Sequence, residues 1–184
     1  MTKLNEIAKI HSGIRNTQFK NKEKNYEYYM ISLTNENNFK INKNNMESLF
    51  TDKKLDDKFL LKKGDIIMKL TPPYVSQVMD FDSNNITISS NYAIIKVNEK
   101  YSPEILNFYL NSEYIKKQIY QLSEQTSIKV ITISNIKNFN IINLEKYQDE
   151  DYIELITTFQ EKRRLMEEKI NLEENILEEL FFGE

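Results

Sequence analysis

The spacing of hydrophobic residues changes along this chain, and each change predicts a different kind of element. Apolar residues between positions 4 and 10 recur at helical spacing before Gly13, which predicts a short helix over residues 3–12 with His11 near its end. Later stretches are rich in aromatic and β-branched residues and have the length of strands. These predicted strands cover residues 26–33, 65–70 and 92–97, and an Asn- and Lys-rich surface connection over 34–45 follows the first.

Helix-start signals coincide just after residue 101. Ser102 can cap a helix, Pro103 suits the first helical position, and Glu104 puts an acid in the first turn. A second helix with one apolar stripe is predicted over residues 113–122. The body of the chain is therefore predicted to be α+β, with a mixed sheet and two helices near its end. Two more β-like runs follow these helices, at residues 129–134 and 139–142.

From Asp149 the sequence predicts one long helix. Asp149 can cap it, and no helix breaker occurs before Gly183, so the helix can reach 33 residues, or ~50 Å. A helix of that length cannot lie entirely on so small a body, and six of eight heptad seam positions are apolar. We therefore expect a coiled-coil arm; the alternative is an amphipathic helix packed on its own body. The seam residues are Ile156, Arg163, Ile170 and Leu177 at position a, and Phe159, Met166, Glu173 and Leu180 at position d.

Composition narrows the possible chemistry. The 184 residues suit one domain, or a domain plus an appendage, and no apolar run resembles a membrane span or a signal peptide, so we expect a cytoplasmic protein. With no cysteine and His11 as the only histidine, zinc clusters, disulfides and His-based nucleophilic triads are excluded. The three glycines cannot supply a phosphate-binding glycine loop. We expect no metal site.

The charges are divided between two segments. Residues 1–144 hold 20 Lys and Arg against 15 Asp and Glu, a net charge of +5. Residues 145–184 hold 5 against 13, a net charge of −8, and the two parts together give the overall −3. A basic body joined to an acidic tail favours nucleic acid as partner for the body and protein as partner for the tail.

Two motifs invite an enzymatic interpretation. Residues 71–74, Thr-Pro-Pro-Tyr, resemble the active-site tetrapeptide of amino-methylating DNA methyltransferases. Thr71 lacks the acceptor of those enzymes, however, and the glycine loop for S-adenosylmethionine is missing, so a proline turn before a strand near Val75 is the favoured interpretation. The acidic pairs at 56–57 and 80–82 lack a nuclease-type Glu-x-Lys partner and are expected to be solvated turn residues.

Five segments in order resemble the target recognition domains of type I restriction-modification specificity subunits. They are residues 4–13, 60–67 (Leu-Leu-Lys-Lys-Gly-Asp-Ile-Ile), 88–95, 102–112 (Ser-Pro-Glu-Ile-Leu-Asn-Phe-Tyr-Leu-Asn-Ser) and 127–141, and together they span most of the chain. The chain departs from the family in having no Pro-x-Pro before the long helix, although Gln148 is kept, and no glycine in the loop at residues 123–126, just before Ser127. Specificity subunits carry two recognition domains and two long helices, whereas this chain has one of each and so looks like a half-subunit.

The resemblance implies a division of labour. Residues 1–148 would be the target recognition domain, and residues 149–184 the helix for dimerisation and contact with partner subunits. The chain itself would be non-catalytic and without a cofactor, with S-adenosylmethionine on a methyltransferase subunit and ATP on a restriction or motor subunit contacted indirectly. The expected partner is double-stranded DNA, with no membrane involved. The alternative is a stand-alone interaction or anti-restriction module that uses the helix to occupy the partner's docking site.

Loop residues with side chains suited to bases and phosphates are the predicted DNA contacts. They are Arg15, Asn16, Gln18, Lys20, Lys22, Lys69, Thr71, Tyr74, Ser76, Gln77, Thr126, Ser127 and Lys129.

The seam also predicts how two arms would pair. In an antiparallel homodimer centred on residue 168, Arg163 of one copy faces Glu173 of the other, so the two charged seam residues compensate each other. A parallel pair would instead juxtapose like charges. The homodimer would hold two recognition domains over a palindromic split site, and the rival is a chain that pairs only with partner-subunit helices.

Overall fold

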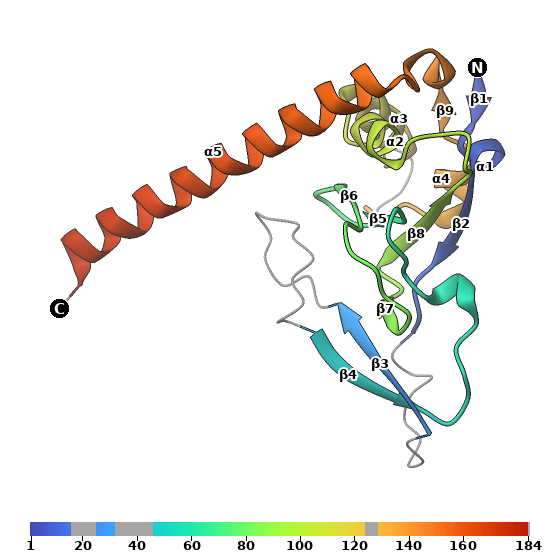
Figure 1. Ribbon diagram of the computed structural model, residues 1–184, viewed down its shortest axis with the longest axis horizontal. Coiled ribbons are helices and arrows are strands. Elements are labelled where there is room, and N and C mark those ends of the chain that lie inside the picture. The colour runs from blue at the N-terminus through green and yellow to red at the C-terminus, as the bar shows by residue number, and fades with distance from the viewer. Residues whose placement is uncertain (16–24, 32–45, 124–128, 184) are drawn as a thin grey trace.

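The computed structural model describes residues 1–15, 25–31, 46–123 and 129–183 (Figure 1). At its centre lies a four-stranded antiparallel sheet in the order β2-β8-β5-β6. The strands are β2 (Ala8–Ser12), β8 (Tyr92–Val97), β5 (Ile66–Lys69) and β6 (Ser76–Val78).

A second, mixed sheet packs on one face of the central sheet. Its order is β4-β3-β7, with β3 antiparallel to β4 and parallel to β7. A two-stranded pairing of β1 with β9 ties the N-terminus to the chain that leads into the long helix. These strands are β3 (Tyr26–Ile31), β4 (Met46–Thr51), β7 (Ile86–Ile88), β1 (Thr2–Lys3) and β9 (Asn140–Ile141).

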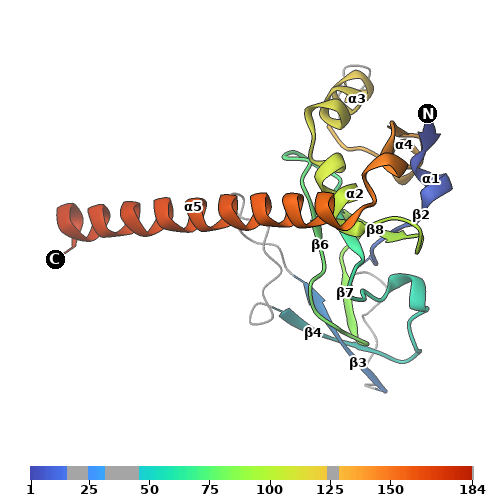
Figure 2. The same cartoon turned by 45° about the horizontal axis from the view of Figure 1, so that its top comes forward.

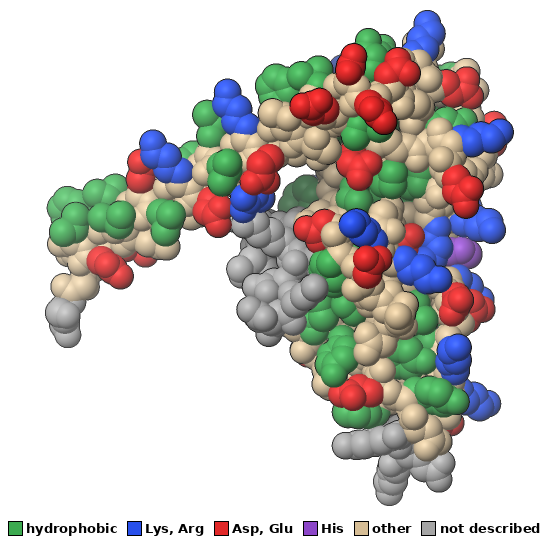
Figure 3. Space-filling view, viewed as in Figure 1, with side chains coloured by type: hydrophobic (Ala, Val, Ile, Leu, Met, Phe, Trp, Pro, Cys, Tyr) green, Lys and Arg blue, Asp and Glu red, His purple; other side chains and the backbone are tan. Residues whose placement is uncertain are grey.

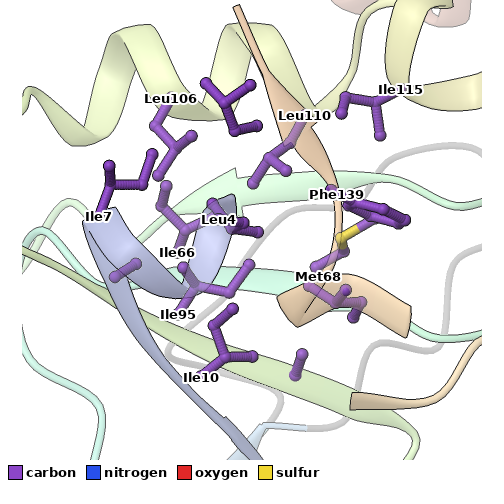
Figure 4. Packing of buried hydrophobic residues seen from close by; sticks show 14 of the residues in the cluster. Leu4, Ile7, Ile10, Ile66, Met68, Ile95, Leu106, Leu110, Ile115 and Phe139 are labelled. Carbon is purple, nitrogen blue, oxygen red and sulfur yellow. The ribbon is translucent and has the colours of Figure 1, made fainter. Parts of the chain in front are cut away.

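The helices α2 (Pro103–Leu110), α3 (Glu113–Ser123) and α4 (Ile133–Lys137) pack on the other face of the central sheet. Ile66 and Met68 join the core on this side, which we call the helix-side core (Figure 4). Ile67 points the opposite way, into a second core against β3 and β7, which we call the sheet-side core. Burial on both faces explains why the central strands read as continuous apolar runs.

The predicted helix over residues 3–12 is wrong beyond its first turn. Only α1 (Leu4–Ile7) is helical, and the chain continues as β2. Along β2, Ala8 and Ile10 are buried in the helix-side core, while Lys9 between them is exposed. Pairing with β8 over all five residues of β2 outweighs the local helical spacing. His11 is consequently a strand residue opposite Ile94, and its predicted place at a helix end is also wrong.

The predicted strand over residues 129–134 is wrong as well, for a local reason. Thr132 caps α4: its Oγ1 accepts a hydrogen bond from the Asn135 backbone N–H at 3.2 Å, and Asn135 Oδ1 accepts one from the Thr132 N–H at 2.8 Å. This reciprocal capping starts a helix where the apolar run suggested a strand. The other predicted strands and helices are confirmed within the described residues, including the start of α2, where Ser102 Oγ accepts from the Ile105 N–H.

The long helix α5 (Glu150–Phe182) begins after the 3₁₀ turn η4 (Leu144–Tyr147) and projects from the body (Figures 1 and 2). Asp149 precedes it in extended conformation, but its side chain makes no capping hydrogen bond. Its backbone carbonyl instead accepts from the Tyr152 N–H at 3.1 Å. None of the described helices combines the length and the apolar character needed to cross a membrane.

Candidate nucleic-acid interface

Four segments distant in sequence meet at one end of the central sheet. The Leu70 N–H donates to the Asn91 carbonyl at 2.9 Å, and the Ser90 N–H donates to the Ile14 carbonyl at 2.8 Å. The Ile131 N–H in turn donates to the Leu70 carbonyl at 2.9 Å. We call this region the loop end; it comprises residues 14–15, 70–75, 89–91 and 129–131.

Tyr74 holds two of these segments together. Its hydroxyl donates a hydrogen bond to the Lys129 backbone carbonyl at 3.0 Å, and its ring packs at the margin of the helix-side core. Burial, and secondly the neighbouring Tyr120, raise the pKa of the Tyr74 phenol. The hydroxyl therefore stays protonated and can donate at neutral pH. Residues 71–74 form the connection between β5 and β6, as the proline-turn interpretation predicted.

The two predicted contact residues in β6 have different surroundings. Ser76 is only 8% exposed, and its hydroxyl donates to Asn107 Oδ1 at 2.8 Å. Its N–H donates to Asn111 Oδ1 at 2.9 Å, so Ser76 ties β6 to α2 and presents no free polar group to a ligand. Gln77 lies opposite Ile67 in the central sheet, and its Oε1 is buried without a hydrogen-bond partner among the described residues.

The other predicted DNA contacts fall into two groups. The structure brings five of them to the loop end or the strand that leads into it, with Arg15 and Lys129 exposed and the rest partly exposed. These five are Arg15, Lys69, Thr71, Tyr74 and Lys129. The remaining predicted contacts lie outside the described residues: Asn16, Gln18, Lys20, Lys22, Thr126 and Ser127.

Sequence reasoning missed two polar or aromatic features of this region. Residues 89–91, Ser-Ser-Asn, connect β7 to β8 within the loop end, and Asn91 is exposed. The sequence contained a signal for this turn, because a polar triplet between two buried strands predicts an exposed turn. Tyr120 of α3 is 58% exposed and acts electrostatically on Tyr74, a proximity that its position on a helix face did not reveal.

Basic groups also surround the outer strand of the central sheet. Burial is the main cause that lowers the pKa of His11, followed by the positive charges of Lys137, Lys58 and Lys96, while Asp56 acts in the opposite direction. Lys96 is itself neutralised by Asp65, with Nζ and Oδ2 2.6 Å apart. Lys58 is likewise paired with Asp56, Nζ to Oδ2 at 3.0 Å, so His11 is uncharged at neutral pH and two of its three neighbouring lysines are neutralised.

The acidic pairs behave as turn residues. Asp56 caps the 3₁₀ turn η3 (Asp57–Phe59) through a hydrogen bond from the Lys58 N–H to its carboxylate at 3.0 Å. Asp80 and Asp82 are exposed outside any helix or strand. Within the described part of the chain, no group of three or more acidic or histidine side chains could hold a metal ion.

The arm exposes the predicted seam. Figure 3 shows hydrophobic side chains gathered towards the free end of α5. Phe159 is 60% exposed and Leu180 is 74% exposed, whereas Ile156 is partly buried against the helix-side core of its own body. Arg163 pairs with Glu167 on the same helix, Nε to Oε1 at 3.0 Å. The other seam residues Met166, Ile170 and Leu177 are exposed apolar side chains, and Glu173 lies 3.6 Å from Lys169.

A second apolar stripe runs along α5. Leu165, Leu172 and Ile176 are spaced by seven and four residues, so they share one helix face, and each is more than half exposed. Leu165 directly precedes the seam residue Met166 in sequence, which turns its side chain about 100° away from the seam. The arm therefore carries a second apolar stripe, which lies apart from the seam at Leu165 and Leu172 and meets it at Ile176, four residues before Leu180.

No protein-family model and no curated protein matches the chain. Among solved structures it is similar to a chain studied for the complex assembly and conformational transition of the type I R-M system, with a TM-score of 0.59 and 13% identity over 97% of this chain. It is equally similar to the HsdS subunit from Thermoanaerobacter tengcongensis, with a TM-score of 0.59 and 16% identity over 99% of this chain. This chain spans less than half the length of each, 42% and 44% respectively.

These likenesses establish the fold. The resemblance to type I specificity subunits drawn from the sequence is confirmed at that level, as is the prediction of an α+β body followed by one long C-terminal helix.

Proposed function

We propose that this chain is a DNA-recognition subunit of a type I restriction-modification system, working in the cytoplasm without catalytic activity of its own. The observation that carries the proposal is the match of nearly the whole chain to less than half of two solved type I chains. That match supports a unit of one recognition domain, residues 1–148, and one assembly helix, residues 149–184. Methyl transfer and ATP-driven cleavage would then belong to partner subunits.

The loop end is the proposed DNA-contacting surface. Exposed Arg15 and Lys129 would contact phosphates together with Lys69, and the polar groups of Thr71 and Asn91, in the same loop end, would reach base edges. The net charge of +5 over residues 1–144 supports this assignment. The residues between 16 and 22 named from the sequence continue directly from Arg15 and stay in the proposal, whereas the buried Ser76 does not.

The arm is the proposed assembly element. One apolar face, with Phe159, Met166 and Ile170, would pair antiparallel with a second copy about residue 168. The exposed residues Leu165 and Leu172 of the second stripe point away from this seam, so they would stay accessible in such a pair and suit a helix of the methyltransferase subunit. Two recognition domains held this way would read a palindromic split site.

DNA binding can be tested with two matched charge reversals. We expect Lys69→Glu with Lys129→Glu to weaken binding to duplexes of any sequence. The slope of log affinity against log salt should fall by about 0.9 for each phosphate that the variant no longer neutralises. Lys62→Glu with Lys63→Glu is the control, because both lysines are exposed at the opposite end of β5 from Lys69.

Fluorescence anisotropy with a random-sequence duplex, at several salt concentrations, measures both variants. An unchanged affinity in the Lys69 and Lys129 variant, or an equal loss in the control, would show that the loop end is not the DNA surface. A chain that binds no DNA but captures a methyltransferase subunit would favour the stand-alone interaction module instead.

A further inference from the structure

The arm is attached to the body over a short junction. Among the described hydrophobic residues of α5, the two that pack against the helix-side core are Ile153 and Ile156, in its first two turns. Across the junction the rings of Tyr147 and Tyr152 meet edge to face with centroids 5.1 Å apart. Beyond these residues α5 extends away from the described body (Figure 2). Among the described residues, the contacts that set its direction therefore lie at its root.

Gln148 makes short hydrogen bonds at this root, and it stands two residues before Glu150, where α5 begins. Its Oε1 accepts from the Ser102 N–H at 2.6 Å, and its Nε2 donates to the Leu144 carbonyl at 2.7 Å. Ser102 is the residue that caps α2, so one side chain joins the start of α2 to the start of α5.

A neighbouring contact reinforces the same junction. The Tyr101 hydroxyl donates to Glu145 Oε1 at 3.2 Å, so two consecutive residues before α2 are bonded to the segment before α5. Tyr101 and Glu145 form an exposed contact, whereas the Gln148 bonds are partly buried. We expect Gln148 to contribute most of the angular stiffness.

Small rotations at this root have large effects at the free end. A helix of 33 residues is ~50 Å long, so a rotation of about 10° at its root moves its tip by about 9 Å. Successive base pairs are about 3.4 Å apart, so this displacement corresponds to between about two and three base pairs. In an antiparallel pair the partner's recognition domain is attached beside that tip, and it would move by the same distance.

We infer that Gln148 is a positioning residue that fixes the direction of α5 relative to the recognition domain and thereby the spacing between the two half-sites. The link between Gln148 and the spacing of half-sites rests on the proposed function. Gln148 would act through the junction and would not contact DNA.

The mechanical part can be tested in the full chain by spin labelling, because the sequence contains no cysteine. Labels at Lys117→Cys on α3 and Glu174→Cys on α5 report the distance between body and arm, and excess unlabelled chain suppresses signals between copies. We expect the width of the distance distribution to increase at least about twofold in Gln148→Ala, since this variant removes a side chain bonded at both amide atoms. Gln148→Glu keeps an acceptor for Ser102 and should give an intermediate width.

Gln118→Ala is the matched control. Gln118 also bonds the backbone through both amide atoms, accepting from the Asn140 N–H at 2.9 Å and donating to the Asn140 carbonyl at 3.1 Å, but away from the root of α5. Its removal should leave the width unchanged. A Gln148→Ala distribution as narrow as that of the unsubstituted chain, or equal broadening in Gln118→Ala, would overturn the inference.

The DNA part uses duplexes whose half-sites are separated by different spacers. We expect the unsubstituted chain to prefer one spacer by about tenfold, equivalent to about 1.4 kcal/mol, over spacers two base pairs longer or shorter. Gln148→Ala should reduce that preference below about threefold with the half-site sequence unchanged. An unaltered spacer preference would refute the link to spacing. If the unsubstituted chain binds no split site, the proposed function fails, while the distance distributions still decide the role of Gln148 at the junction.

Discussion

The Tyr74 hydroxyl and the Lys129 carbonyl form a hydrogen bond of 3.0 Å between loops 55 residues apart. We expect Tyr74→Phe to lower the free energy of unfolding by about 1 kcal/mol, the usual net value of such a bond, and to weaken DNA binding by up to about fivefold. Urea unfolding and anisotropy measure the two effects. Tyr152→Phe, which keeps the ring contact with Tyr147, should change neither. No decrease in either measurement for Tyr74→Phe would contradict the prediction.

Gly13 is required by a close approach of two backbones. A methyl group at this position would overlap the carbonyl oxygens of Ile88 and Ser89, and the Gly13 N–H donates to the Tyr92 carbonyl at 2.9 Å. We expect Gly13→Ala to lower the free energy of unfolding by about 2–4 kcal/mol, because backbone and not a flexible side chain would have to move. Urea denaturation followed by circular dichroism gives this value.

The adjacent Ser12→Ala serves as the control for Gly13. It removes only a hydroxyl that donates to the Gly13 carbonyl at 3.0 Å, and should cost about 1 kcal/mol or less. Equal losses of stability for the two substitutions would contradict a steric role for Gly13.

His11 should make the fold sensitive to mild acid. Burial first, and then Lys137 and the other nearby lysines, lower its folded-state pKa below the ordinary 6.5. As the pH falls through 6.5 the unfolded chain takes up a proton that the folded chain still excludes, so the free energy of unfolding decreases until the folded-state pKa is reached. This contribution is fully present above pH 6.5.

Replacing His11 with a residue that does not titrate tests whether its protonation destabilises the fold in mild acid. The decrease in urea midpoint between pH 7.5 and pH 5.5 should be smaller in His11→Gln than in the unsubstituted chain, because no proton uptake at this position then favours unfolding. An identical decrease in both would show that His11 makes no contribution.

Arg163 and Glu173 test the register of the proposed arm pairing. In a pair centred on residue 168 they face each other across the seam, so Arg163→Glu should weaken dimerisation by about tenfold or more. Adding Glu173→Arg should restore it. Sedimentation velocity over a range of concentrations measures both variants.

Exchanging the charges of Arg163 and Glu173 tests the contact between chains, because the ion pairs that both residues make within their own helix are weak. Among the described residues, Arg163 pairs with Glu167 and Glu173 with Lys169 on their own helix, contacts worth about 0.3–0.5 kcal/mol each. Helix content at low concentration should therefore change little. An unsubstituted chain that stays monomeric at micromolar concentration rules out the homodimer, and a double variant no better than the single one rules out the register.

Local signals account for what the sequence predicted correctly in the fold. Ser102, Pro103 and Glu104 specify the start of α2 within three consecutive residues, and the absence of breakers after Asp149 specifies the length of α5. β2 could not be predicted this way, because its conformation is decided by pairing with β8, more than eighty residues further on. The predicted strand over residues 129–134 was wrong for the opposite reason, because a local signal decided the conformation. The Thr132 cap starts a helix at Ile133 and outweighs the β-propensity of these residues.

The sequence predicted which loops form the candidate site, but not which of their side chains contact one another. Tyr74 and Lys129 were named separately, and their hydrogen bond follows from a meeting of segments that no local pattern encodes. Ser76 looked like a loop donor because the sequence does not show that Asn107 of α2 and Asn111, which caps the end of α2, lie against it. Asn91 was not predicted as a contact residue. The sequence shows that it follows two serines, but it does not show which distant segments lie beside it.

The two cores on opposite faces of the central sheet allow the molecule to evolve in halves. The root of the arm, with Ile153 and Ile156, belongs to the core beneath the helices, whereas the β4-β3-β7 sheet belongs to the core on the other face. Side chains of the second sheet can therefore be exchanged without disturbing the packing that anchors α5. A lineage could diversify that half of the molecule while keeping the root of α5 unchanged, and the central strands, which contribute to both cores, would be the part least free to vary.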